Sequence, residues 1–429
     1  MSDQRKVPTG RLARLTNMAR VGVRTGMSVL GGGEGTGAAE QAAALLGNLR
    51  GIAAKVGQMA SYVDGMIPEQ QRAAYERVLS SLQTATANSP FGEVQALLEA
   101  ELGRSLEQAF AEFEPEPMAS ASIGQVHRAR LHDGRAVAIK VQHPGIEQAI
   151  EADLKSAGSL TSVISLLGPR TMNPESAFEE VAERFREELD YEHEAAQQVA
   201  FAEMHRDDPR IHVPAVIASH SSKRVLCSEL ATGHSFSEAI AAEPSLRRSY
   251  AELLWHFVFK GVLQHGRFNA DPHPGNFLFY PDGRITFLDF GCIQVLAPHQ
   301  LQSARQMHGS TVAGDEAAFR RAAAVISETT PGPYETELLG YLWRCYEPLK
   351  HRPFHMTAEY VSGVVRGIQD LKGHMLRKTS NVTPIPRGLL FTNRLQFGFY
   401  SVLARFDVPA DYAGITRALL EGPALTQKL

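Results

Sequence analysis

The sequence predicts an α+β fold with two lobes, the first containing most of the strands and the second mainly helical. Strand-like apolar runs gather at residues 113–141 and 211–230, whereas the segments before and after them read as helices. A hairpin at residues 268–291 interrupts the second helical region. A chain of 429 residues is long enough for more than one core, which fits this division.

The composition is that of a soluble globular protein. Apolar residues make up 44% and charged residues 21% of the chain, and the net charge of −4 argues against a general nucleic-acid binder. The three cysteines are far apart in the sequence, which excludes a disulfide framework and fits a reducing compartment. The chain has no secretory signal and no apolar run of about 18 residues, so we expect a cytoplasmic protein without a transmembrane helix.

Three side chains suited to metal–phosphate chemistry flank the predicted hairpin, whose turn is Pro281-Asp282-Gly283. Asp271 and Asn276 lie five residues apart before it, and Asp289 follows it. Protein kinases use this layout: a catalytic Asp, an Asn five residues later, and the Asp of an Asp-Phe-Gly sequence. The spacing therefore predicts Asp271 as the catalytic residue and Asn276 and Asp289 as magnesium ligands. The alternative is that both Asp residues lie in ordinary turns.

The first predicted unit, residues 1–37, is basic and ends in a glycine-rich joint. Leu12, Leu15 and Met18 recur at helical spacing among arginines, as in amphipathic helices that lie on anionic membranes. The alternative is a solvated helix or a frayed terminus. Residues 38–112 form the second unit and are predicted to be helical. Because Gly in a helix interior costs about 1 kcal/mol relative to Ala, Gly57 predicts a close backbone approach.

The third predicted unit is a lobe at residues 113–230. A His132-Asp133-Gly134 turn between alternating apolar runs predicts a hairpin, and its second strand contains Val-Ala-Ile followed by Lys140. In kinases such a lysine binds the α- and β-phosphates and pairs with a helical glutamate, which the helical residues 146–205 would supply. Residues 119–122 lie where kinases have a Gly-rich loop, but here the loop is rich in Ala and Ser.

Two further strands are predicted at residues 213–218 and 224–230. The second strand ends at Glu229 and Leu230, at a connector between the lobes. Kinases bind adenine through backbone groups of this connector. The fourth unit, residues 231–429, is predicted to be helical apart from the hairpin.

Taken in order, these motifs resemble the UbiB/AarF/ADCK family of atypical protein-kinase-like proteins over about residues 40–400. Several members of that family are tied to ubiquinone (coenzyme Q) biosynthesis. The KxGQ motif of the family is matched by Lys55, Gly57 and Gln58, and its ExD motif by Glu188 and Asp190. The glutamate that pairs with the strand lysine is matched by Glu194, and the Ala-rich nucleotide loop by Ala119, Ser120, Ala121 and Ser122.

The resemblance implies a bilobal fold with a helical N-terminal extension over the cleft, where Lys55 would meet Glu188 and Asp190. It implies binding of ATP or ADP with Mg²⁺, and ATPase or phosphotransferase activity in ubiquinone or isoprenoid-lipid metabolism. The implied partners are the nucleotide, isoprenoid or quinone lipids, ubiquinone-pathway proteins and an anionic membrane surface contacted peripherally. One alternative is a nucleotide-gated lipid-binding scaffold or chaperone with vestigial catalysis. A second is a small-molecule kinase of the aminoglycoside or choline type, against which the KxGQ motif and the Ala-rich loop argue.

Overall fold

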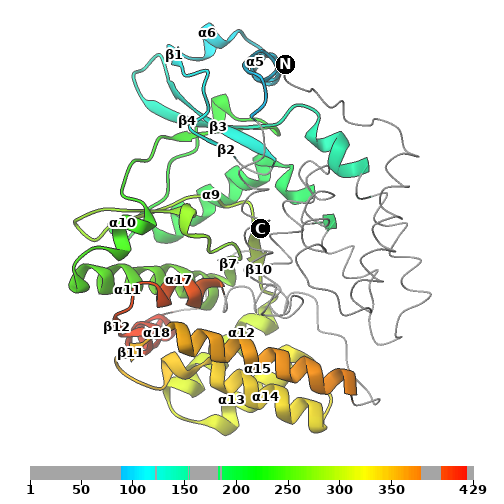
Figure 1. Ribbon diagram of the computed structural model, residues 1–429, viewed down its shortest axis with the longest axis vertical. Coiled ribbons are helices and arrows are strands. Elements are labelled where there is room, and N and C mark those ends of the chain that lie inside the picture. Colours follow the sequence, from blue (N-terminus) through cyan, green and yellow to red (C-terminus); the bar gives the residue numbers. More distant parts are fainter. Residues whose placement is uncertain are drawn as a thin grey trace, which may run out of the picture.

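The computed structural model describes residues 88–120, 123–152, 154, 182–183, 186–377 and 398–422. These residues form a lobe built on an antiparallel sheet, here called the N-lobe, and a mainly helical lobe, the C-lobe (Figure 1). The predicted α+β class is therefore confirmed. Of the predicted helical extension at residues 38–112, residues 38–87 lie outside those described, whereas residues 88–112 are described and include two helices.

The N-lobe sheet has five strands in the order β1-β3-β4-β6, with β2 also pairing with β3, and every pairing is antiparallel. The strands are β1 (Glu112–Phe113), β2 (Ala119–Ser120), β3 (Gly124–Arg130), β4 (Ala136–Gln142) and β6 (Val225–Glu229). Strands β3 and β4 form the hairpin predicted from Asp133-Gly134, and Gly134 has the positive φ of 90° that such a turn favours.

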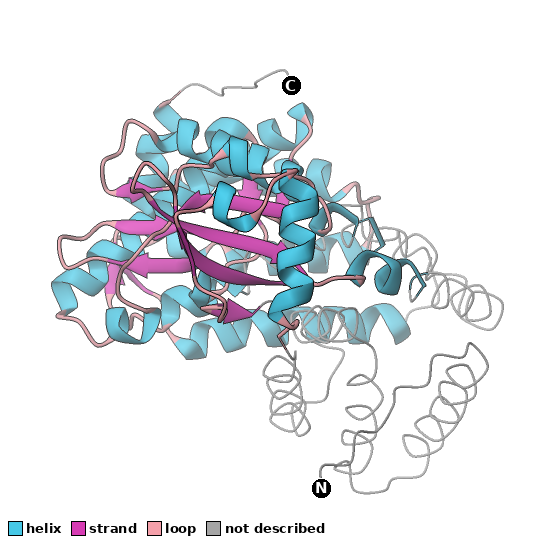
Figure 2. Ribbon diagram, turned by 90° about the horizontal axis from the view of Figure 1, so that it is seen from above, coloured by secondary structure: helices cyan, strands magenta, loops and turns pink. Residues whose placement is uncertain are grey.

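Alternate side chains of β4 point to the two faces of the sheet. Val137, Ile139 and Val141 pack under two helices, α5 (Phe91–Leu102) and α6 (Leu106–Ala109). Figure 2 looks onto this part of the molecule from above and shows a helix lying across the strands. Because successive side chains of a strand point to opposite faces, Lys140 points to the other face of the sheet.

Helix α9 (Tyr191–His205) covers that other face. Ile123, Leu189, Tyr191 and Leu226 form a shared core between the helix start and the sheet. Leu226 is the strand partner of Lys140 in the β4–β6 register, so Lys140 lies beside the first turn of α9.

The prediction of a strand at residues 213–218 is wrong. Only β5 (Ile211–His212) is a strand, and it pairs in parallel with β9 in the C-lobe. Val216 forms a single bridge to Ser228, and a 3₁₀ helix, η1 (Ala218–His220), follows. Pro214 has no N–H group for a sheet ladder, which explains why the apolar run does not continue β5.

The C-lobe packs its helices around α11, in which Trp255 is fully buried. Its described helices are α10 (Phe236–Ile240), α11 (Pro244–Lys260), the π-helical turn η2 (Gly261–His265), the 3₁₀ turn η3 (Pro274–Asn276), α12 (Pro298–Val312), α13 (Glu316–Ser327), α14 (Pro333–Cys345), the 3₁₀ turn η4 (Glu347–Leu349), α15 (Ala358–Arg377), α17 (Tyr400–Ala404) and α18 (Tyr412–Glu421). The short strands β11 (Phe354–His355) and β12 (Pro409–Ala410) pair with each other, a detail that the prediction of an all-helical remainder missed. Among the described helices, none is both long and apolar enough to cross a membrane.

The predicted hairpin of the C-lobe is confirmed as β8 (Phe277–Phe279) and β9 (Ile285–Phe287), joined by a turn in which Gly283 has a φ of 88°. A second antiparallel pair joins β7 (Arg267–Asn269), just before Asp271, to β10 (Ile293–Val295), just after Gly291. The two pairs bring both polar ends of the 268–291 segment to one place in the fold.

Candidate active site

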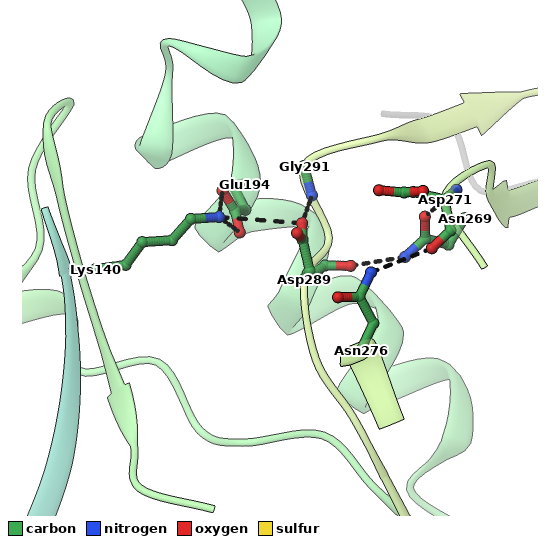
Figure 3. A network of polar contacts seen from close by, with 7 residues as sticks. All are labelled: Lys140, Glu194, Asn269, Asp271, Asn276, Asp289 and Gly291. Carbon is green, nitrogen blue, oxygen red and sulfur yellow. Dashed lines mark hydrogen bonds and ion pairs between the residues drawn. The ribbon is translucent and has the colours of Figure 1, made fainter. Parts of the chain in front are cut away.

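Lys140 and Glu194 form a close ion pair between β4 and α9. The Nζ atom of Lys140 donates to both carboxylate oxygens of Glu194, at 2.7 and 2.9 Å (Figure 3). The Glu194 side chain is only 5% exposed and that of Lys140 is 20% exposed, so the pair is largely shielded from water. The structure therefore brings together the strand lysine and the glutamate that the family resemblance paired with it.

Asp289 lies next to this pair, with its Oδ1 atom 4.0 Å from the Nζ atom of Lys140. Burial alone would lower the pKa of Lys140, but the carboxylates of Asp289 and Glu194 outweigh burial and raise that pKa above its ordinary value. The ring of Tyr191 lies 5.0 Å from the same Nζ atom and adds a cation–π contact. Lys140 is thus a fixed positive charge at neutral pH, as a phosphate-binding group requires.

The backbone of Asp289 is held in an unusual conformation. Its φ of 60° lies in the left-handed region, which Asp tolerates better than most residues. The Oδ1 atom accepts a hydrogen bond from the amide of Gly291 at 3.1 Å, so the Asp-Phe-Gly turn closes on its own carboxylate. With 41% of the side chain exposed, the carboxylate remains accessible to a ligand.

Asn269 joins the two loops of the site, although no spacing rule in the sequence singles it out. Its Nδ2 atom donates to the carbonyl oxygen of Asp289 at 2.6 Å, and its Oδ1 atom accepts from the amide of Asp271 at 2.8 Å (Figure 3). One side chain at the end of β7 therefore fixes the distance between the predicted catalytic loop and the predicted metal-binding turn.

Asn276 is oriented by the backbone of the same loop. Its Nδ2 atom donates to the carbonyl oxygen of Asp271 at 3.2 Å. Because a carbonyl oxygen can only accept, the amide nitrogen must face it, and the amide oxygen of Asn276 is turned away. That oxygen is the atom that a metal ion would require.

The donor set fits Mg²⁺ bound together with phosphates. Mg²⁺ prefers hard oxygen ligands and is commonly held by one or two side chains plus the phosphates of its substrate. The amide oxygen of Asn276 and the carboxylate of Asp289 are such ligands. Within the described part of the chain, no group of three His, Cys, Asp or Glu side chains could hold a metal by itself, so an all-protein cage is not offered there.

The connector residues Glu229 and Leu230 already use their amides within the protein. The amide of Glu229 donates to Ala215 at 2.8 Å, and that of Leu230 donates to Ala136 at 3.0 Å. The prediction that these residues bind adenine through their backbone is therefore restricted to their carbonyl oxygens.

The remaining predicted residues are placed only in part. Ala119 and Ser120 form β2 and are exposed at the edge of β3, whereas Ala121, Ser122, Lys55 and Gln58 lie outside the described residues. Glu188 is half-buried just before α9, and Asp190 is the N-cap residue of that helix. The contact of Lys55 with Glu188 and Asp190 therefore stays a prediction.

Comparison with known proteins gives the family. The ABC1 atypical kinase-like domain matches residues 81–323, which is more than half of the chain. The chain is 32% identical over 310 residues to the mitochondrial atypical kinase COQ8B of Rattus norvegicus, covering 68% of this chain and 58% of the rat protein. It is 37% identical over 224 residues to the chloroplastic Protein ACTIVITY OF BC1 COMPLEX KINASE 3 of Arabidopsis thaliana, covering 51% of this chain and 31% of that protein.

A solved structure resembles the fold over most of its length. The complex of Rv3197 with erythromycin, from Mycobacterium tuberculosis, has a TM-score of 0.60 and 27% sequence identity, covering 90% of this chain and 95% of that one. The matches span only 58% and 31% of the rat and Arabidopsis proteins, respectively. The two-lobed fold, the family motifs and these matches lead to one conclusion: the chain belongs to the ABC1 atypical kinase-like family, the group of AarF-domain and COQ8 proteins that its sequence resembles.

Proposed function

We propose that this protein binds a complex of Mg²⁺ with ATP or ADP and transfers or hydrolyses the terminal phosphoryl group of ATP. The observation that supports this most strongly is the shielded Lys140–Glu194 ion pair beside the accessible carboxylate of Asp289. A buried lysine held by one carboxylate and facing a second is costly to build for stability alone. Strongly perturbed charges of this kind are typical of functional sites.

Each residue of the site has a distinct proposed role. Lys140, held by Glu194, binds the α- and β-phosphates, while Asn276 and Asp289 hold the metal. Asp271 orients the attacking hydroxyl or water and accepts its proton. Mg²⁺, when bound, neutralises the charge of the phosphates. Phosphoryl transfer depends mainly on positioning and on stabilisation of charge, and Asn269 serves positioning by linking Asp271 to Asp289.

The pathway is proposed from the relatives. The rat relative is named for COQ8, and the sequence motifs resemble a family tied to ubiquinone, so we propose a role in ubiquinone or isoprenoid-lipid metabolism with proteins of that pathway as partners. We further propose a cytoplasmic location with peripheral contact to an anionic membrane. Comparing the quinone and lipid content of a deletion strain with that of its parent tests the pathway, and unchanged profiles would contradict it.

Thermal stabilisation by Mg-nucleotide tests the metal ligands. Asp289→Asn and Asn276→Ala should remove most of the stabilisation while the folds survive, because both side chains lie at the edge of the hairpin rather than in its core. At a ligand concentration one hundred times the Kd, the wild-type protein should gain about 2.7 kcal/mol of stability. Asp282→Asn is the matched control, since Asp282 lies exposed in the turn of the same hairpin and pairs with Arg284. Undiminished stabilisation of both site variants would overturn the assignment.

Turnover separates an enzyme from a nucleotide-gated scaffold. Asp271→Asn should leave Mg-ATP binding intact and reduce ATP turnover by about 10²–10⁴-fold, the usual contribution of a positioned general base. Turnover is measured with and without anionic liposomes and a quinone-like phenol. Binding of Mg-ATP without turnover under every condition would favour the scaffold.

A further inference from the structure

Asp190 caps the start of helix α9, a structural role that its place in the ExD motif does not indicate. Its Oδ1 atom accepts hydrogen bonds from the amides of Glu192 and His193, both at 3.1 Å. Its backbone is extended, with φ −112° and ψ 91°, so it is the N-cap of α9. Two of the amides that every helix leaves unsatisfied at its start are thereby satisfied, and the negative charge matches the helix dipole.

The turn that Asp190 caps is the turn that holds Lys140. The amide of Glu194 donates to the carbonyl oxygen of Asp190 at 3.1 Å, so Glu194 belongs to the first turn of the helix. Tyr191, the first residue of α9, is fully buried and places its ring 5.0 Å from the Nζ atom of Lys140. Both groups that hold the ammonium of Lys140 from the helix side therefore depend on this turn being formed.

We infer that Asp190 is a positioning residue: it caps α9 and thereby holds Glu194 against Lys140. This role needs a hydrogen-bond acceptor at the cap and does not need a negative charge. It differs from the role that the family resemblance implies, in which the charge of Asp190 meets Lys55. The inference rests on the proposed function only in assuming that the Lys140–Glu194 pair serves nucleotide binding.

Substitutions at Asp190 distinguish the effect of its capping hydrogen bonds from the effect of its negative charge. Ser and Asn cap helices nearly as well as Asp but carry no charge, whereas Ala does neither. Asp190→Ala should weaken Mg-ATP affinity about fivefold, the factor expected for loss of one cap. Asp190→Ser and Asp190→Asn should stay within about twofold of the wild-type affinity on the same grounds.

Asp315→Ala is the matched control, because Asp315 caps α13 in the C-lobe by accepting from the amide of Ala318 at 2.9 Å. It should lower the Tm and leave the affinity unchanged.

Two measurements without nucleotide test directly whether the cap at Asp190 holds Glu194 against Lys140. Hydrogen exchange of the amides of Glu192 and His193 should accelerate in Asp190→Ala and stay slow in the Ser and Asn variants. Acylation of Lys140 by N-hydroxysuccinimide acetate, followed by mass spectrometry, should rise several-fold in Asp190→Ala and in the positive control Glu194→Gln, but not in Asp190→Ser.

The outcomes are distinct. If the Ser and Asn variants are as defective as Asp190→Ala, the charge matters rather than the cap, and the inference is wrong. It is equally wrong if Asp190→Ala changes neither the exchange of the capped amides nor the labelling of Lys140. If the wild-type protein does not bind Mg-ATP, the proposed function fails, while exchange and labelling still decide the role of Asp190.

Discussion

At the scale of single residues, the ion pair between Lys140 and Glu194 contributes to the stability of the N-lobe and belongs to the proposed nucleotide site. Two charges that leave water lose their hydration, and their attraction compensates for that loss only while both partners are present. The contact distances of 2.7 and 2.9 Å show that the compensation is in place here. Removing one partner therefore leaves the other as an unfavourable buried charge.

Lys140→Met should destabilise the protein in a pH-dependent way. Burial raises the pKa of Glu194, and without Lys140 nothing from the strand opposes that shift, so the folded variant takes up a proton more readily than the unfolded chain. A carboxyl group with a raised pKa stabilises the folded state below its unfolded pKa of about 4.3, and this stabilisation is lost as the pH rises. The free energy of unfolding of Lys140→Met should be about 3–5 kcal/mol below that of the wild type at high pH, and this difference should be smaller near about pH 5. Urea denaturation of both proteins from about pH 5 to alkaline pH measures this difference.

The control is the double variant Lys140→Met with Glu194→Gln. It has no titrating group at this position, so its deficit relative to the wild type should vary much less with pH. A Lys140→Met deficit that is constant from acid to alkaline pH would show that Glu194 is not an uncompensated charge in the variant.

At the scale of elements, the C-lobe depends on a polar contact between α11 and α18. The indole nitrogen of Trp255 donates to the Oγ1 atom of Thr416 at 2.9 Å, and both residues are fully buried. A buried donor without an acceptor costs free energy because it has lost water and gained no partner. The two helices are thus joined by a contact that an apolar side chain of the same shape cannot replace.

Thr416→Val should therefore cost about 1–3 kcal/mol of stability, although it preserves the volume of the side chain. Thr416→Ser is the control, since it keeps the hydroxyl group and removes only a methyl group. Chemical denaturation of the three proteins gives the comparison. A Val variant as stable as the wild type, or a Ser variant less stable than the Val variant, would show that packing rather than the hydrogen bond holds α11 to α18.

Local sequence patterns were sufficient for elements with strong turn chemistry. The hairpins at Asp133-Gly134 and at Pro281-Asp282-Gly283 follow from residues that tolerate or fix a turn conformation, and both are present. The run at residues 213–218 was apolar enough for a strand, but Pro214 cannot donate to a ladder, and the run forms only the single bridge from Val216 to Ser228.

The site was partly predictable for the same reason. Asp271, Asn276 and Asp289 follow from their spacing, whereas Asn269 is recognisable only once β7 and the turn after β9 are adjacent in space. Asp190 had a local signal, an Asp just before a helix with acids in its first turn, but the ExD motif drew attention to its charge instead.

At the scale of the whole molecule, the site lies between two lobes, and the segment expected to regulate it comes from outside the described residues. The N-lobe supplies Lys140 and Glu194, and the C-lobe supplies Asp271, Asn276 and Asp289 (Figure 3). The predicted membrane contact belongs to residues 1–30, which contain none of the predicted site residues. It can therefore be tested without disturbing the site.

Deletion of residues 1–30 should abolish co-sedimentation with vesicles that contain anionic lipid, while ATP turnover measured without lipid stays unchanged. Added salt should weaken binding of the intact chain, because screening at about 1 M salt shortens the reach of charges to about 3 Å. Replacement of Arg11, Arg14 and Arg20 by Gln keeps the apolar positions and removes positive charge. This variant therefore tests how far the charges, rather than the apolar side chains, are needed for vesicle binding. Equal co-sedimentation of the full-length and truncated proteins would contradict the prediction.

The pairing of β10 with β7 has a consequence for regulation. In protein kinases, phosphorylation of the segment after Asp-Phe-Gly orders a loop and switches the enzyme on. Here β10 begins at Ile293 and α12 at Pro298, so the corresponding segment is a short strand paired with the strand that precedes the predicted catalytic loop. Residues 292–302 contain no Ser, Thr or Tyr. A protein kinase would therefore find no hydroxyl group to phosphorylate between the Asp-Phe-Gly sequence and the first turn of α12, so residues 292–302 cannot be controlled in this way.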